Sequence, residues 1–111
     1  MVVDFVRLII IMKIMAKIEL LKKILTKHKK ELAHKYKVKE IGIFGSYVRG
    51  DQKGKSDIDI LVEFKEVPGF FKFIELEDHL SEILGIKADL VMKSALKPHI
   101  GKHILSEVIY L

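Results

Sequence analysis

The stretch between Gly45 and Asp59 holds the residue types that could do chemistry in this chain. It starts with a Gly-Ser pair, continues through Arg49 and a polar glycine-containing loop, and ends in Asp57 and Asp59, one residue apart. Apolar runs flank it on both sides, which predicts a strand, a corner, a loop and a second strand. A structural loop can use the glycines, but it has no need for two carboxylates on one face of a strand.

Asp57 and Asp59 indicate a metal site. Residues two apart on a strand point to the same side, with roughly 7 Å between their Cα atoms. Carboxylates held this close repel each other, by about 1 kcal/mol at 4 Å in water and by more where solvent is excluded. Mg²⁺ removes that repulsion, since it takes carboxylate oxygens and keeps positions open for phosphates. The spacing alone is weak, because two exposed aspartates at a strand edge fit it equally well.

The corner before the aspartates favours a bound phosphate. Backbone N–H groups at Gly45 and Ser46 can approach an anion, helped by the positive end of the following helix. The Ser46 hydroxyl can donate to it, and Arg49, one turn on, can reach it with a planar fork of donors. Phosphate donors and metal-binding carboxylates then meet across one turn, which suits a metal–nucleoside triphosphate complex. The glycine-rich motifs of P-loop and dinucleotide-binding folds are absent from the sequence.

A two-metal site needs a third carboxylate. Asp89 is the best candidate, because it lies on a predicted strand between apolar residues, where an aspartate needs a partner or an ion. Glu63 shares a face with Asp57 and Asp59 but lies further along the strand, so it ranks second. Asp78 falls on a predicted helix and is expected to be solvated.

Residues 45–59, with Gly-Ser, ten further residues and then Asp-x-Asp, resemble the motif of the nucleotidyltransferase superfamily that includes DNA polymerase beta. The compact form, Gly-Ser-x-x-Arg-Gly followed by Ser-Asp-Ile-Asp-Ile-Leu-Val, is similar to the minimal nucleotidyltransferases. These are prokaryotic proteins of about this size that are encoded beside helical HEPN-domain toxins. The resemblance extends from about residue 12 to residue 111 and is strongest over residues 44–62 and 88–91.

The resemblance implies an α/β fold of two layers, in which a small mixed β-sheet has helices packed on one face, as in the palm of polymerase beta. It also implies transfer of a nucleoside monophosphate from ATP, with two Mg²⁺ ions and release of pyrophosphate. By motif position, the residues that hold the triphosphate are Gly45, Ser46 and Arg49. The implied metal ligands are Asp57, Asp59 and Asp89, and Asp89 could also help to deprotonate the acceptor hydroxyl.

A partner protein is implied as well. In the best-understood pairs of this family the small protein is an antitoxin that transfers AMP to a tyrosine of a HEPN toxin and so inactivates it. Relatives that modify antibiotics or RNA carry an additional domain to hold the acceptor, for which 111 residues leave no room. We therefore expect a protein adenylyltransferase that can form a hetero-oligomer with its toxin. Two alternatives stay open: a nucleotidyltransferase acting on a small molecule or an RNA end, and a non-catalytic antitoxin that masks the toxin.

Composition agrees with a single cytoplasmic domain. The chain has no cysteine, which fits a reducing compartment, and its net charge is +5. Ten of the 20 basic residues are lysines between Lys13 and Lys39, a run that is typical of a solvated helix face, so nucleic acid is not the expected partner. The apolar N-terminus is interrupted by charges and is shorter than the roughly 20 residues of a membrane span.

The apolar N-terminal region also sets the expected boundary of the domain. Residues 13–111 are expected to form one nucleotidyltransferase domain. Residues 1–12 are then an N-terminal extension, either disordered or part of the first helix, and Met12 and Met15 are alternative starts of the protein.

Hydrophobic periodicity predicts the elements that position these residues. Helices are expected over residues 13–36, from Ser46 as N-cap to about residue 50, from residue 70 to a stop at Gly85, and from Pro98 onward. Strands are expected over residues 38–44, 57–64 and 87–92, with a turn over 51–56, and residues 108–111 either extend the last helix or form a strand. The apolar stripe of the first helix is Ile14, Ile18, Leu21, Leu25, His28 and Leu32, widened by Leu20 and Ile24.

Other conspicuous residues have ordinary explanations. His28 is expected at the edge of the core, and the Phe70-Phe71-x-Phe73 cluster inside it. His99 and His103 are spaced like metal ligands, but no carboxylate accompanies them in sequence, so an exposed pair is favoured. Tyr47 either packs on the next helix or lines the nucleotide pocket.

Overall fold

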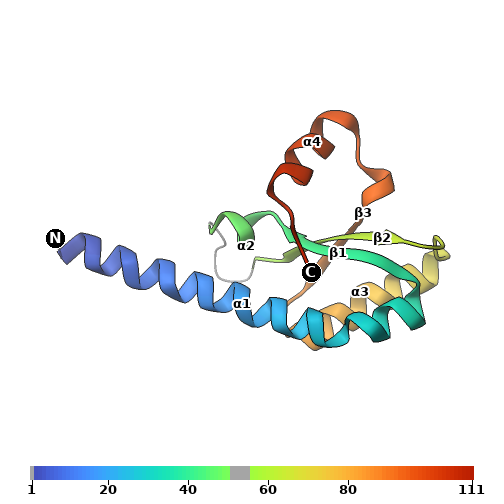
Figure 1. Ribbon diagram of the computed structural model, residues 1–111, viewed down its shortest axis with the longest axis horizontal. Helices are drawn as coiled ribbons and strands as arrows, with labels where there is room; N and C mark the ends of the chain where they lie inside the picture. Colours follow the sequence, from blue (N-terminus) through green and yellow to red (C-terminus); the bar gives the residue numbers. More distant parts are fainter. Residues whose placement is uncertain (1, 51–55) are drawn as a thin grey trace.

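A four-stranded sheet organises the fold (Figure 1). The computed structural model describes residues 2–50 and 56–111, and the side chains of the first segment from residue 4 onward. The elements are α1 (Val2–Tyr36), β1 (Val38–Phe44), α2 (Ser46–Arg49), β2 (Ile58–Phe64), α3 (Phe70–Leu84), β3 (Ala88–Met92), a 3₁₀ turn (Lys93–Ala95), α4 (Pro98–Glu107) and β4 (Ile109–Tyr110). The strand order is β3-β2-β1-β4.

The sheet is mixed, as predicted. β1 pairs antiparallel with β2 and with β4, whereas β2 and β3 run parallel. The parallel pair needs a long crossover, and α3 supplies it. Of the two alternatives for residues 108–111, the strand is confirmed. Most of the predicted turn over 51–56 lies outside the described residues.

The core lies between the sheet and the two long helices, α1 and α3, which cover the same face (Figure 1). Ile58, Ile60 and Val62 alternate along β2, face these helices and are buried. α4 lies on the other side of the sheet. The predicted two-layer arrangement is therefore confirmed for α1 and α3, and α4 adds a cover over the opposite face.

α1 is longer than the predicted helix. It begins at Val2 instead of residue 13, because no proline or glycine interrupts the helical residues before Tyr36. Its first half projects from the sheet (Figure 1) and exposes apolar side chains such as Phe5 and Leu8. Among the described residues, no helix combines the length and the apolar character that crossing a membrane requires. Leu20, predicted to widen the buried stripe, is 58% exposed, because it faces away from the sheet.

The aromatic cluster at the start of α3 is only partly in the core. Phe73 packs against the core and meets the ring of Phe64, with 6.4 Å between the ring centroids. Phe70 and Phe71 are 72% and 85% exposed, so their predicted burial is wrong. They occupy the first turn of α3, where their rings contact each other and Phe73 alone faces the sheet.

Candidate active site

Gly45 makes the corner between β1 and α2. Its φ of 80° is in the left-handed region that favours glycine, and a Cβ there would overlap Oδ2 of Asp59 and lie 2.9 Å from its Cγ. The corner and the aspartate of β2 are therefore in direct contact. Any residue larger than glycine would push them apart.

Ser46 is the first residue of α2, as predicted, but it is not the N-cap. Gly45 takes that place, and its carbonyl accepts the N–H groups of Val48 and Arg49, both at 3.0 Å. The cap therefore comes from the backbone of Gly45, and no side-chain cap bond is formed there. The structure thus places Ser46 within α2, half-buried, one residue beyond the corner.

The parallel register of β2 and β3 brings the predicted carboxylates together. Asp59 pairs with Asp89 on the neighbouring strand, and Asp57 immediately precedes β2. Strands in a sheet are about 4.8 Å apart, so Asp59 and Asp89 are lateral neighbours. Asp89 is exposed, because the apolar residues on either side of it face the core and Asp89 itself faces the opposite side.

The electrostatics of this group favour a cation. Burial raises the pKa of Asp59, and the negative charges of Asp89 and then Asp57 raise it further, while Arg49 opposes the shift. The raised pKa means that the ionised form of Asp59 is disfavoured in the native site, first by burial and then by the neighbouring carboxylates. Hard divalent cations such as Mg²⁺ prefer carboxylate oxygens as ligands, and Asp57, Asp59 and Asp89 place several of them close together. These three residues therefore fit the ion.

Side chains of α3 hold β3 in this register. β3 is an edge strand, and the N–H groups of Ala88 and Leu90 point away from β2. The Ala88 N–H donates to Oγ of Ser81 at 2.9 Å, and the Leu90 N–H donates to Oε2 of Glu77 at 3.0 Å. These two bonds flank Asp89 on both sides and fix the backbone that presents it.

A cleft of about 480 Å³ opens beside the carboxylates. One wall is the sheet, with the corner at Gly45, and the other is the segment from the 3₁₀ turn through α4. The residues that line it are Phe44, Gly45, Arg49, Asp59, Asp89, Val91, Ala95, Leu96, Lys97, Ile100, His103, Ile104 and Glu107. The predicted phosphate residues Gly45 and Arg49 therefore share one cleft with Asp59 and Asp89.

Glu107, at the end of α4, is a site residue that the sequence did not reveal. The Gly45 N–H donates to its Oε1 at 3.0 Å, and Nη1 of Arg49 donates to its two carboxylate oxygens at 3.2 and 3.3 Å. The Glu107 side chain is only 14% exposed. Donors predicted to hold a phosphate thus hold a carboxylate of the same chain, which shows that they can bind an anion together. Its i+4 spacing from His103 is the sequence signal that could have found this glutamate, whereas its contact with Gly45 and Arg49 depends on how α4 folds over the sheet.

Glu63 and Tyr47, the other residues considered for the site, do not line the cleft. Glu63 forms ion pairs with Lys39 at 3.7 Å and Lys93 at 3.6 Å, which engages it further along the sheet. Tyr47 is buried in the core and its hydroxyl donates to the carbonyl of Ser56 at 3.3 Å, so packing is the explanation that holds for it.

The two histidines of α4 differ from each other. Both are exposed, as predicted, but His103 also lines the cleft, with Nε2 3.9 Å from Oε2 of Glu107. The prediction that no carboxylate accompanies the two histidines in sequence is therefore wrong, because Glu107 follows His103 at i+4 on the same helix.

The chain is similar to known proteins in sequence and in fold. Protein adenylyltransferase MntA of Thermococcus cleftensis is 56% identical over 97 residues, which are 87% of this chain and 98% of that protein. A crystal structure of a toxin–antitoxin with AMP-PNP is similar at a TM-score of 0.65 and 28% identity, covering 77% of this chain and 69% of that chain.

A tri-AMPylated Shewanella oneidensis HEPN toxin in complex with MNT antitoxin gives a TM-score of 0.60 at 23% identity, over 81% of this chain and 70% of that chain, which shows the shared fold. The family model of the nucleotidyltransferase domain matches residues 25–111, from the middle of α1 through every strand and both walls of the cleft. The chain therefore belongs to the nucleotidyltransferase domain family.

Proposed function

We propose that this chain is a magnesium-dependent protein adenylyltransferase that acts as an antitoxin, transferring AMP from ATP to a tyrosine hydroxyl of a HEPN toxin. The observation that carries the proposal is the cleft in which Asp59 and Asp89 face the anion-holding donors of Gly45 and Arg49. The 56% identity to a protein adenylyltransferase supports AMP as the group transferred. Similarity to a toxin–antitoxin with AMP-PNP supports both the partner class and the nucleotide.

The three aspartates are the proposed ligands of two Mg²⁺ ions. Bound there, the ions would polarise the phosphate and activate the attacking hydroxyl. Asp59 follows Asp57 by two residues and pairs with Asp89 on the neighbouring strand, so it is the residue placed to serve both ions. Asp89 is exposed at the edge of the sheet, where an incoming acceptor can reach it, and it is the proposed acceptor of the hydroxyl proton.

The triphosphate is assigned to the corner opposite. The Gly45 N–H and the Arg49 guanidinium already bind a carboxylate, and a phosphate oxygen offers the same charge and similar acceptor geometry. Ser46, one residue further, adds its hydroxyl. In this assignment the phosphate takes the place of the Glu107 carboxylate, which has to move away when the nucleotide binds.

The decisive experiment combines the purified chain with ATP, Mg²⁺ and the HEPN protein encoded beside it. We expect the HEPN protein to gain the mass of one or more AMP units on a tyrosine, with release of pyrophosphate. A stable complex without transfer would support masking instead. Nucleotide added to RNA or to a small molecule, with none on the HEPN protein, would support the other alternative.

Glu107→Gln is expected to strengthen nucleotide binding. The substitution removes the negative charge that competes for Gly45 and Arg49 but keeps the size of the side chain. Because Arg49 is 45% exposed, the competing ion pair is worth about 1 kcal/mol at most, which corresponds to roughly fivefold tighter binding. Titration calorimetry with a non-hydrolysable ATP analogue measures it.

Glu82→Gln, an exposed position on α3, is the matched control and should leave the affinity unchanged. Weaker nucleotide binding by Glu107→Gln would contradict the competition and would show that Glu107 serves to orient Arg49.

A further inference from the structure

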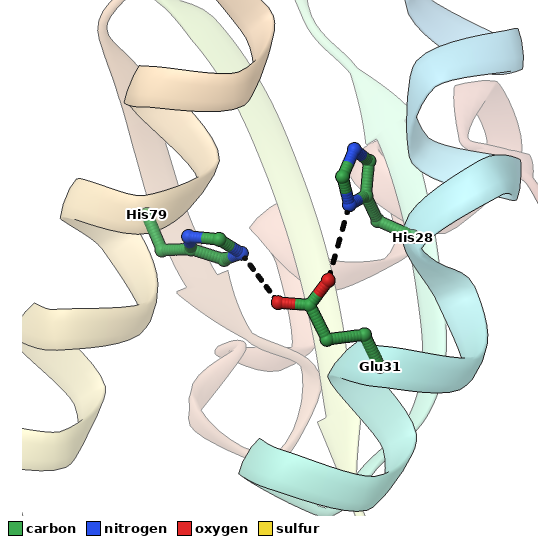
Figure 2. Close-up of side chains that lie close together, drawn as sticks. All are labelled: His28, Glu31 and His79. Carbon is green, nitrogen blue, oxygen red and sulfur yellow. Dashed lines mark hydrogen bonds and ion pairs between the residues drawn. The ribbon is translucent and has the colours of Figure 1, made fainter.

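Two histidines and a glutamate meet at the seam between α1 and α3 (Figure 2). Nδ1 of His28 lies 3.2 Å from Oε2 of Glu31, one turn along α1, and Nε2 of His79 on α3 lies 3.1 Å from the other oxygen. One potential ligand atom from each residue falls within 4.8 Å of the others. We propose that these three side chains bind a transition metal ion, with Zn²⁺ the best fit, at a site separate from the carboxylates of the cleft.

A buried ring nitrogen lies in this cluster. Nε2 of His79 is shielded from solvent and lies 3.1 Å from a Glu31 oxygen, as an ion pair outside the geometry of a good hydrogen bond. Leaving such a nitrogen unsatisfied is costly, and most buried polar atoms have a partner. Coordination of a metal ion would satisfy it, since the lone pair of a neutral imidazole is a zinc ligand.

The types of ligand atom in the cluster, and their spacing, also favour zinc. Two imidazole nitrogens and one carboxylate form a ligand set found around protein zinc, with a water in the fourth position. Ligands about 2.0 Å from a tetrahedral zinc are about 3.3 Å from one another. The two close contacts, 3.2 and 3.1 Å, use different oxygens of Glu31. With one ligand atom taken from each residue, all three atoms lie within 4.8 Å of one another, so the side chains have to draw closer to reach that edge length. Glu31 is exposed, which leaves a route for the ion and a place for the water.

Contacts with neighbouring aromatic rings hold the two histidine rings in place. The ring of His79 stacks on Tyr36, a core residue at the end of α1, with 6.0 Å between centroids and 28° between planes. The rings of His28 and His79 meet edge to face at 6.3 Å. These contacts restrict the ring orientations before any ion arrives, which reduces the entropy that binding has to overcome.

A simple ion-paired triad is the competing explanation. Hydrogen bonding to His28 lowers the pKa of Glu31, and the charge of His79 adds to the effect, as a triad without metal also requires. In that triad the contact between the buried Nε2 of His79 and Glu31 is an ion pair without good hydrogen-bond geometry. A metal would account for the convergence of the three side chains and would give this nitrogen a ligand bond.

The ion would join the two helices that cover one face of the sheet. Its ligands come from positions 28, 31 and 79, so it closes a long loop of the chain, and the site and the cleft lie on opposite faces of the sheet (Figures 1 and 2). An ion that binds only the folded state raises the unfolding temperature through mass action. We therefore assign it a structural role.

The test uses the full chain, stripped with a chelator and then titrated with Zn²⁺ alone. We expect one ion per chain to depend on this cluster, and an increase in Tm of about 10 °C at a Zn²⁺ concentration of about 100 times Kd. Replacement by Co²⁺ should give the visible absorption of a four-coordinate ion. His79→Gln and, independently, His28→Gln should each lower the affinity at least about tenfold, as loss of a ligand does.

His34→Gln is the matched control, since His34 lies exposed on the same helix and should leave the affinity intact. Circular dichroism of each apo variant shows whether it is folded. If the His79 variant does not fold, the His28 variant alone tests the loss of a ligand. The proposal is overturned if the wild-type chain binds no Zn²⁺ at this level. It is equally overturned if binding survives both histidine substitutions or is lost only in Asp59→Asn.

Discussion

Asp59→Asn is expected to abolish nucleotidyl transfer while leaving the chain at least as stable as the wild type. The amide keeps the shape of the side chain but removes the charge at the centre of the carboxylate group, so we expect transfer to fall by about 10³-fold. Because burial and then the charges of Asp89 and Asp57 raise the pKa of Asp59 in the native state, its negative charge opposes folding, and removing the charge relieves both effects. Initial rates of AMP transfer and thermal unfolding of the same preparations measure the two effects.

The pH dependence of stability gives an independent check. A carboxyl whose folded pKa is raised takes up its proton in the native state first as the pH falls. The destabilisation is therefore fully present above the folded pKa and is lost as the pH falls toward 3.8, the ordinary value. The difference in Tm between Asp59→Asn and the wild type should shrink over that window.

Magnesium and a control variant complete this prediction. Mg²⁺ should raise the Tm of the wild type and have much less effect on Asp59→Asn, because the ion compensates the same repulsion. Asp78→Asn, exposed on α3, should change neither transfer nor the response to Mg²⁺. Near-normal transfer by Asp59→Asn would refute the assignment of the carboxylates, and a lower Tm would refute the electrostatic argument.

Gly45→Ala is expected to cost both stability and activity. The new Cβ would sit at φ 80° and overlap the Asp59 carboxylate, so backbone strain and steric overlap act together. We expect a loss of about 2–4 kcal/mol in the free energy of unfolding. Transfer should fall by about 10²-fold, because the displacement needed to relieve the overlap moves phosphate donors relative to the carboxylates. Urea unfolding and transfer assays are the measurements.

Gly85→Ala is the control that separates backbone strain from steric overlap. Gly85 also has a left-handed φ, 68°, but a Cβ there meets nothing within 4 Å. It should cost about 1 kcal/mol, the conformational part alone, and leave transfer intact. Equal effects at Gly45 and Gly85 would show that contact with Asp59 is unimportant.

Local pattern was enough to predict the strands and the carboxylate cluster. Ile58, Ile60 and Val62 recur with period two along β2, so the face that packs against the helices follows directly. The placement of Asp89 beside Asp59 required only that their strands be neighbours, and the register confirms it. The role of these aspartates as metal ligands remains a prediction.

The features that could not be predicted from the sequence depend on tertiary contacts. Glu107 reaches Gly45 and Arg49 because α4 folds over the sheet, and the order of residues carries no trace of that. Phe70 and Phe71 are apolar enough to predict burial, but the direction in which α3 leaves the loop decides which aromatic ring faces the sheet. The cluster of His28, Glu31 and His79 likewise needs the packing of two helices.

The bonds from Ser81 and Glu77 to β3 have a consequence beyond the geometry of Asp89. An edge strand normally presents free N–H groups that can pair with a strand of another molecule. Here the side chains of α3 occupy those donors at Ala88 and Leu90 and act as a substitute for the missing neighbouring strand. The same contacts that present the aspartate thus protect this edge of the sheet against intermolecular β-pairing.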